Sequence, residues 1–207
     1  MYKILDMEKW SRKDHFSFFS KFEEPFFGIT AQVNCSKAYD LCKENGFSFF
    51  LYYLHASLFA ANKIENFRFR IQGQDVIIYD RINASPTINR EDGTFGFSYM
   101  DFYEDFEKFQ KEAKKEIERV RNTTGLIPAM KGENVIHFSA VPWINFSSIS
   151  HARSFSFPDS CPKISFGKVI ESVGNKHMSV SVHVHHALMD GYHVGKFLEE
   201  LQNLLNR

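Results

Sequence analysis

The sequence of 207 residues has little cysteine and no net charge. It contains 3 cysteines without a CxxC spacing, and its 25 basic side chains balance 25 acidic ones. An odd number of cysteines gives no disulfide framework, so we expect a reducing compartment. Zero net charge leaves no basic field that could hold a nucleic acid or an anionic membrane. Neither kind of partner is expected.

Long apolar runs are absent as well. The apolar stretch at residues 49–61 is too short to cross a bilayer, and His55 and Ser57 interrupt it. Residues 1–6 show no apolar segment of the kind found in signal peptides. These features predict a soluble cytoplasmic protein.

Phenylalanine, in contrast, is abundant, with 23 residues. The rings cluster at residues 16–19, 26–27 and 47–50. Most of them must fill a hydrophobic core, and so many large rings also suit an apolar ligand pocket or a subunit interface.

The spacing of apolar residues predicts a mixed α/β fold. Alternation at period two marks strands, and recurrence at three and four marks amphipathic helices, the first capped by Ser11 or Asp14. No repeat, linker or low-complexity tract interrupts the chain. We therefore expect residues 1–207 to form one two-layer domain, with a mixed, mostly antiparallel sheet packed against helices. The pattern gives seven strands, at 26–33, 67–72, 75–79, 94–99, 135–140, 163–169 and 178–184, and five helices, at 14–22, 36–43, 48–63, 102–124 and 194–205.

Four histidines gather near the C-terminus: His183, His185, His186 and His193. The central pair stands where the last strand gives way to a loop, and Gly191 is expected to let that loop turn before the last helix. Such junctions commonly present catalytic groups, although two adjacent histidines are equally compatible with a polar strand end. A zinc site is disfavoured, because neighbouring strand residues point to opposite faces and no carboxylate or thiol has a usual ligand spacing.

Three short motifs resemble those of one enzyme family. Residues 185–193, HHALMDGYH, resemble the HHAxxDG(F/Y)H active-site signature of the chloramphenicol acetyltransferases and, more loosely, the DHRxxDG motif of dihydrolipoyl acyltransferase cores. Residues 10–16, WSRKDHF, are similar to the family's W-x-R-x-x-H-F motif, and residues 139–146, SAVPWINF, to its S-A-x-P-W-(V/I)-x-F motif. The resemblance runs in order from Trp10 to the C-terminal helix.

This resemblance implies the family's fold and an O-acetyltransferase that uses acetyl-CoA as co-substrate. His186, the second histidine of the pair, would be the general base, and the hydroxyl of Ser139 would stabilise the tetrahedral oxyanion. Arg12 would bind Asp190 through two hydrogen bonds and fix the loop that presents His186. Neither a metal nor an acyl-enzyme is implied.

The family also implies a homotrimer whose active sites lie between subunits. His151 and Lys163 fall where the drug-modifying enzymes tend to carry apolar pocket residues, and His183 replaces a usual glutamine. A buried cation in an apolar pocket is costly, so either Lys163 points away or the acceptor is more polar than chloramphenicol. Carried over by position, the acceptor-binding residues are Phe18, Phe19, Phe95, Ser165, His151 and Lys163, and the CoA-binding residues are Trp143 and Lys168.

Chloramphenicol is the expected acceptor, and several other functions are weighed against it. One is acetylation of another small alcohol or amine by the same mechanism, and another is a binding protein that merely keeps the fold. A hydrolase with Ser139 as nucleophile is disfavoured, because no G-x-S-x-G sequence surrounds any serine. The joint presence of Arg12, Ser139, His186 and Asp190 favours the acetyltransferase.

Overall fold

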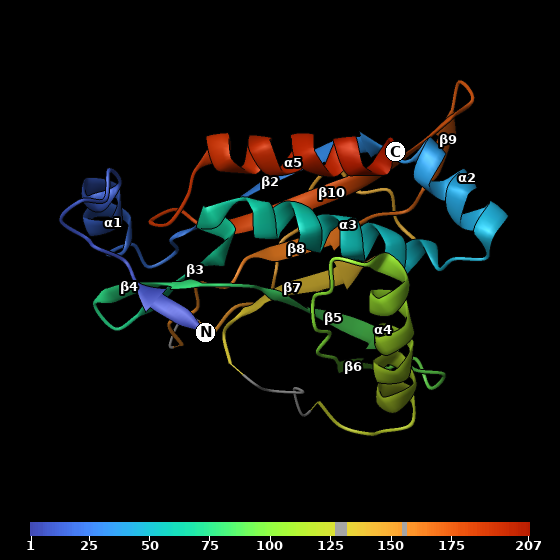
Figure 1. The fold of residues 1–207 in the computed structure, drawn as a ribbon, viewed down its shortest axis with the longest axis horizontal. Coiled ribbons are helices and arrows are strands. Elements are labelled where there is room, and N and C mark those ends of the chain that lie inside the picture. The colour runs from blue at the N-terminus through green and yellow to red at the C-terminus, as the bar shows by residue number, and fades with distance from the viewer. Residues whose placement is uncertain (127–131, 155–156) are drawn as a thin grey trace.

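The computed structural model describes residues 1–126, 132–154 and 157–207 (Figure 1). Over these residues the chain forms ten strands, five α-helices and one 3-10 helix. The strands are β1 (Tyr2–Ile4), β2 (Phe26–Asn34), β3 (Phe69–Gln72), β4 (Asp75–Tyr79), β5 (Asn83–Asn89), β6 (Phe95–Phe97), β7 (Val135–Ala140), β8 (Lys163–Phe166), β9 (Ile170–Ser172) and β10 (Asn175–His185). The helices are α1 (Lys13–Phe19), α2 (Ser36–Asn45), α3 (Phe49–Lys63), the 3-10 helix η1 (Glu65–Arg68), α4 (Phe106–Arg121) and α5 (Gly191–Leu205).

Seven strands form the large sheet, in the order β2-β10-β8-β7-β5-β6, with β9 paired to β10. The β5–β7 and β7–β8 pairs are parallel, and the other pairs of this sheet are antiparallel. Strands β1, β4 and β3 form a second, antiparallel sheet. The predicted fold class, a mixed and mostly antiparallel sheet packed with helices, is confirmed.

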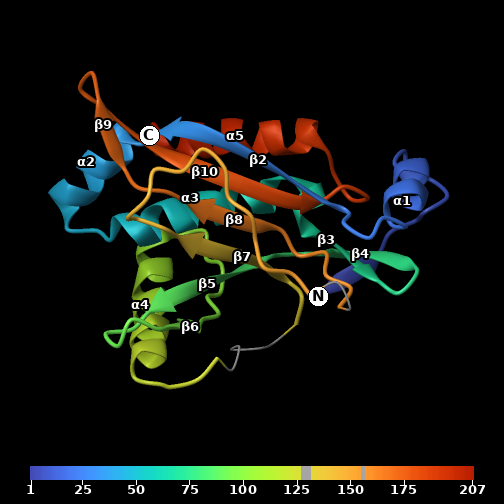
Figure 2. The same cartoon turned by 180° about the vertical axis from the view of Figure 1, so that it is seen from behind.

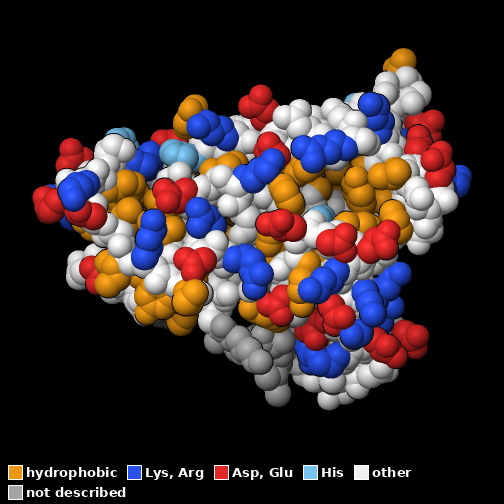
Figure 3. Space-filling view, in the orientation of Figure 1, with side chains coloured by type: hydrophobic (Ala, Val, Ile, Leu, Met, Phe, Trp, Pro, Cys, Tyr) orange, Lys and Arg blue, Asp and Glu red, His pale blue; other side chains and the backbone are white. Residues whose placement is uncertain are grey.

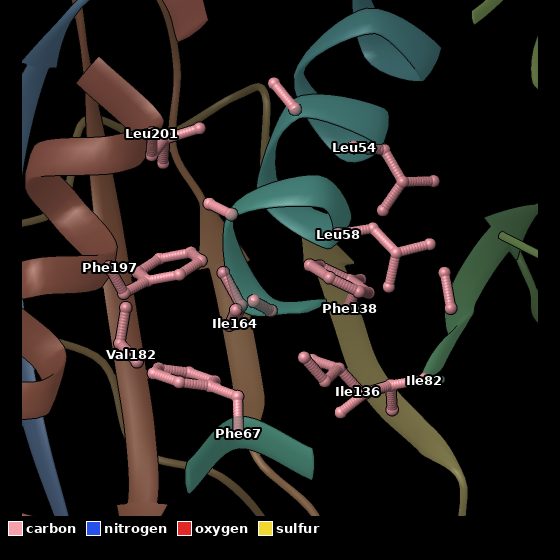
Figure 4. Packing of buried hydrophobic residues seen from close by; sticks show 14 of the residues in the cluster. Leu54, Leu58, Phe67, Ile82, Ile136, Phe138, Ile164, Val182, Phe197 and Leu201 are labelled. Carbon is pink, nitrogen blue, oxygen red and sulfur yellow. The ribbon is translucent and has the colours of Figure 1, made fainter. Parts of the chain in front are cut away.

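Helices cover one face of the large sheet, which we call the inner face (Figure 1). Strand β10 directs Val180, Val182 and Val184 to this face, and all three are fully buried. Burying an aliphatic or aromatic side chain of this size contributes roughly 1.5–3 kcal/mol each, so this layer supplies much of the stability. Figure 4 shows how side chains of α3 and α5 pack against the strands here, among them Leu54, Leu58, Phe197, Leu201, Phe138, Ile164 and Val182.

The opposite, outer face carries the alternate residues of the same strands, and it is polar. One row of strand partners presents Ser139, Ser165, Ser181 and Thr30 side by side. The neighbouring row presents His137, Lys163, His183 and Gly28. None of the described helices covers this face; residues 141–154 and 157–162 cross it instead (Figure 2). Because side chains alternate along each strand, one face of the sheet belongs to the core and the other carries serine, histidine and lysine side chains.

Three strands were missed in the sequence. β1 and β9 have three residues each, and β5 contains Pro86, which normally argues against an interior strand. In the structure Pro86 is the last β5 residue in register with β7, and its carbonyl oxygen accepts hydrogen bonds from the Ser98 N–H, at 3.1 Å, and from the Ser98 hydroxyl, at 2.6 Å. β1 pairs with β4 and so adds a third strand to the β3–β4 hairpin, which makes the separate small sheet. No local sequence pattern predicts this pairing.

Two helix boundaries also differ from the prediction. Helix α1 ends at Phe19 rather than near residue 22, and neither Ser11 nor Asp14 caps it, because Arg12 holds the N-cap position. Helix α4 begins at Phe106, where the Asp105 carboxylate accepts the Lys108 N–H at 2.7 Å. The cap therefore places the start of α4 later than the apolar spacing alone indicated.

No helix among the described residues combines the length and the apolar character needed to cross a membrane. Basic and acidic side chains are interspersed on the face in Figure 3. On α4 they form ion pairs such as Lys115–Glu112 and Arg119–Glu116, as expected for a solvated helix face.

Arg70 joins the small sheet to the large one. The side chain is completely buried in β3. Its guanidinium donates to the main-chain oxygens of Phe67, at 3.0 Å, and Phe69, at 2.5 Å, and to those of Glu133, at 2.7 Å, and Val135, at 2.5 Å. Glu133 precedes β7 and Val135 is its first residue, so one side chain fixes the start of the strand that carries Ser139.

We expect Arg70→Met to lower the free energy of unfolding by roughly 3–5 kcal/mol, because four buried carbonyl groups lose a charged donor. Urea denaturation followed by circular dichroism measures the effect. Arg81→Met is the matched control, since Arg81 is exposed, and it should stay within about 0.5 kcal/mol of the parent. Equal stability of the two variants would contradict this role for Arg70.

Candidate active site

The loop between β10 and α5 presents His186. The His186 N–H donates to the Pro25 carbonyl at 2.8 Å, and the Leu188 N–H closes a turn onto the His185 carbonyl at 3.0 Å. Asp190 ends the loop as the N-cap of α5 and accepts the Tyr192 N–H at 3.1 Å. Gly191 is the first helical residue and has no positive φ, so the predicted turn at this glycine is wrong. The aspartate cap makes the turn instead.

The His186 imidazole is held by two rings and one hydrogen bond. It stacks on Phe19, with ring centres 3.9 Å apart, and meets Phe27 at 4.6 Å. The Nδ1 atom lies 3.2 Å from the Met189 carbonyl oxygen. Because a carbonyl only accepts, this contact assigns the proton of the neutral ring to Nδ1. The Nε2 atom then carries the lone pair that can accept a proton.

Arg12 and Asp190, which lie 178 positions apart, form the ion pair that the resemblance implied, but through one hydrogen bond rather than the predicted two, since the second donor binds a main-chain oxygen. Arg12 donates to the carboxylate at 2.5 Å and to the His186 carbonyl oxygen at 3.2 Å. The arginine is buried, and Nδ1 of His193 lies 2.8 Å from the same carboxylate. Burial raises the pKa of Asp190, but hydrogen bonds from His193 and Arg12 outweigh it, so the pKa lies below the usual range. The carboxylate is therefore ionised at neutral pH and holds the loop.

Ser139 lies elsewhere, on the outer face of β7. It is the strand partner of Ser165 on β8, which pairs in turn with Ser181 on β10. Two strand spacings and five residues along β10 separate Ser139 from His186, which amounts to roughly 15–20 Å. A single chain does not bring these two side chains together.

Lys163 lies on the outer face, near enough to His151 to affect its pKa, and its ammonium is paired with a carboxylate there. Lys163 forms an ion pair with Asp159, donates to the Cys161 carbonyl oxygen at 3.2 Å, and lies 4.4 Å from the centre of the Phe26 ring. Burial is the main factor that lowers the pKa of His151 to about 4, with His183 and Lys163 adding to it. Lys163 is therefore not the unpaired buried cation that the sequence suggested.

The remaining predicted residues are spread over the molecule. Phe18 is 59 % exposed and packs edge-on against Phe19, so it belongs to the His186 side. Phe95 lies on β6, at the far edge of the sheet from β10. Trp143 is 67 % exposed, and Lys168, also exposed, is joined to the same turn because its N–H donates to the Ile144 carbonyl at 2.9 Å.

No sequence pattern pointed to the acidic and basic residues of the loop that crosses the outer face. Asp159 pairs with Lys163, and Arg153 pairs with Glu24 while lying 3.9 Å from the Phe26 ring centre. The same loop lines a cavity of about 360 Å³, together with Ser85, Phe97, Tyr99 and His137. These contacts join distant segments of irregular chain, for which no spacing rule exists. Within the described ranges, no three His, Cys, Asp or Glu side chains are arranged to hold a metal ion.

We expect Asp190→Asn to lower the free energy of unfolding by roughly 1–3 kcal/mol at neutral pH, less than for a fully buried pair because about a third of the side chain is exposed. Asparagine still caps a helix, so the change isolates the ion pair. A depressed pKa stabilises the fold above the unfolded value of about 3.9, so the gap should close as the pH falls below it. Urea titrations across pH test this, with Asp14→Asn as the exposed control; a gap that persists down to about pH 2 would contradict it.

Comparisons with known proteins agree over nearly the whole chain. Residues 1–202 match the family model described as chloramphenicol acetyltransferase. The chloramphenicol acetyltransferase of Proteus mirabilis is 28% identical over 200 residues, which cover 96% of this chain and 92% of that protein. Chloramphenicol acetyltransferase 3 of Escherichia coli is 27% identical over 208 residues, covering 99% and 97%.

Solved structures give the same result. A chloramphenicol acetyltransferase structure superposes with a TM-score of 0.88 at 32% identity, covering 99% of this chain and 100% of that one. A probable dihydrolipoamide acetyltransferase from Listeria monocytogenes has a TM-score of 0.68 at 15% identity, covering 93% and 88%, and shares the fold alone. This chain belongs to the chloramphenicol acetyltransferase family.

Proposed function

We propose that this protein transfers the acetyl group of acetyl-CoA to a hydroxyl of chloramphenicol, with His186 as general base and Ser139 as oxyanion donor. Membership of an acetyltransferase family supports the reaction class. The observation that carries the mechanism is the contact between His186 Nδ1 and the Met189 carbonyl oxygen, because it leaves Nε2 as the proton acceptor.

The reaction needs one proton transfer in each direction. Nε2 of His186 removes the proton of the acceptor hydroxyl while the oxygen attacks the thioester carbon of acetyl-CoA. The tetrahedral intermediate then collapses, the carbon–sulfur bond breaks, and the imidazolium returns the proton to the thiolate. The products are the acetyl ester and CoA. A histidine suits both steps, since its ordinary pKa of about 6.5 allows it to accept and release a proton near neutral pH.

The separation of Ser139 from His186 supports an active site between subunits. At roughly 15–20 Å within one chain, the serine hydroxyl cannot reach an oxyanion formed beside the histidine. A homotrimer in which His186 of one subunit faces Ser139 of the next would complete the site. Irregular chain rather than a described helix crosses the outer face, and Ser139 is only partly buried, which leaves it accessible for such a contact.

The CoA end of the site is proposed at the turn after β7. The exposed indole of Trp143 suits stacking against an adenine ring, and the exposed ammonium of Lys168 suits a phosphate. Pro142, next to the tryptophan, lines a cavity of about 760 Å³ that reaches α3 and α4. Cys35, Cys42 and Cys161 are buried free thiols, which fits a reducing cytoplasm.

The acceptor end is proposed on the outer face. The 360 Å³ cavity lined by Phe97, Tyr99 and His137 has the size of a site for a small drug-like molecule. His137 precedes Ser139 by one step on the same face of β7, so an acceptor there would lie near the oxyanion donor. The polar side chains of Ser85, His137 and Asp159 in this mostly apolar lining favour a second candidate as well, another small alcohol or amine acetylated by the same residues.

His186→Ala should reduce kcat for chloramphenicol acetylation by at least about 10²–10⁴, because the general base is lost. A CoA-thiol release assay with acetyl-CoA and chloramphenicol measures the rate. His177→Ala, at the other end of β10, is the control and should keep parental activity. Full activity of His186→Ala would reject the mechanism, and parental activity with other alcohols alone would reject the drug as acceptor. No thiol release with any acceptor would identify a non-catalytic binding protein.

A mixing experiment tests the shared site. Ser139→Ala alone should lose about 10²–10³ in kcat. When Ser139→Ala and His186→Ala chains are unfolded together and reassembled, about a quarter of the interfaces would join two intact residues, so activity should return to about a quarter of the parent. Mixtures that remain as inactive as the separate variants would contradict a site between subunits.

A further inference from the structure

The loop that presents His186 is tied to the rest of the fold through its carbonyl oxygens. Arg12 donates to the His186 carbonyl oxygen at 3.2 Å. The side-chain amide of Asn66 donates from Nδ2 to the Leu188 carbonyl oxygen at 3.0 Å. The third tie is internal, between His186 Nδ1 and the Met189 carbonyl oxygen, at 3.2 Å. Asn66 precedes Leu188 by 122 positions and belongs to none of the motifs that predicted this site.

Asn66 stands on a rigid element. It belongs to η1, between α3 and β3, whose Phe67 is completely buried and stacks on Phe197 of α5 with ring centres 5.0 Å apart. The Phe67 carbonyl oxygen also accepts a hydrogen bond from the Arg70 guanidinium at 3.0 Å. A polar group carried by packed secondary structure is held more precisely than one carried by a free loop. The Asn66 amide therefore fixes the position of the loop instead of following it.

The hydrogen bond at Leu188 reaches His186 through the geometry of the main chain. The Leu188 carbonyl and the Met189 N–H belong to one planar peptide unit, so they turn together. Asn66 holds the carbonyl, and the Met189 N–H donates to the His185 carbonyl oxygen at 3.2 Å. Leu188 is completely buried, and a buried carbonyl that loses its donor is costly. Without Asn66 the unit would turn toward another donor and move the next carbonyl, that of Met189, out of line with His186.

Building on the proposed function, we propose that Asn66 is a positioning residue for the general base: its amide keeps the Met189 carbonyl in place, and that carbonyl keeps the proton of the neutral His186 ring on Nδ1. The ion pair of Arg12 with Asp190 fixes the two ends of the loop, and Asn66 supplies the contact in its middle. Asn66 thus acts through His186 and not on the substrate.

The kinetic test removes this one hydrogen bond. Asn66→Ala should lower kcat for chloramphenicol acetylation roughly tenfold, the factor carried by one hydrogen bond to a buried group, and leave KM for acetyl-CoA unchanged. Asn66→Asp keeps the shape but sets a carboxylate oxygen against the Leu188 carbonyl, so it should lose at least as much.

Asn62→Ala is the matched control. The Asn62 amide donates to the carbonyl oxygens of Leu58, at 2.9 Å, and Ile82, at 3.0 Å, neither of which belongs to the loop. Its loss should destabilise the fold and keep the parental kcat, because the His186 loop keeps its contacts.

A second measurement reports the tautomer itself and needs no substrate. Nitrogen NMR of protein labelled in histidine shows which ring nitrogen carries the proton, and the signal missing from His186→Ala identifies His186. At about pH 8.5, where histidine is neutral, the parent should show the Nδ1–H form alone. Asn66→Ala should show the Nε2–H form as well.

Three results would overturn the proposal: parental kcat in Asn66→Ala, an equal loss of kcat in Asn62→Ala, or an unchanged His186 tautomer in Asn66→Ala. A parent protein that does not acetylate chloramphenicol would reject the proposed function alone. The tautomer, which is measured without substrate, would still decide the role of Asn66.

Discussion

The arrangement of the candidate site depends on the guanidinium of Arg12. It joins the start of α1 to the loop after β10 by holding both the Asp190 carboxylate and the His186 carbonyl oxygen. The same carboxylate caps α5, so one charged group sets where the loop ends and where the last helix begins. A planar guanidinium has fixed donor directions and can bind two acceptors at once. A lysine ammonium at this position would hold them in a less well defined geometry.

The second constraint is the period of two along β10. Its even-numbered residues from 178 to 184 enter the apolar core, while Ser179, Ser181 and His183 face outward. A shift of the strand by one residue would exchange the two sets, so the burial of the valines fixes the orientation of the polar side chains. The register of this one strand therefore determines both the packing of the core and the placement of the polar side chains.

Much of this could be predicted from local patterns. The strand at 135–140 alternates at period two, and the helix at 49–63 was predicted from a run that is apolar on nearly every face. The ion pair between positions 12 and 190 was implied by matching motifs at both ends. The rest depends on contacts between distant segments. β5 was missed because it contains Pro86, a residue that argues against a strand. Lys163 is paired with Asp159, which lies in an irregular loop. Arg12, rather than a serine or an aspartate, stands at the N-cap of α1. Neither spacing nor propensity carries such information.

The polarity of the outer face explains why no described helix covers it. A helix could cover this face only by placing an apolar stripe against serines and histidines, which would bury polar groups without partners. Irregular chain crosses it instead, and it supplies an ion-pair partner to Lys163 and a cation–π contact to Phe26. Even so, His151 and Ser165 keep polar atoms that no described residue satisfies. A surface that its own chain leaves incomplete is suited to receive its remaining hydrogen bonds from a substrate or a second subunit.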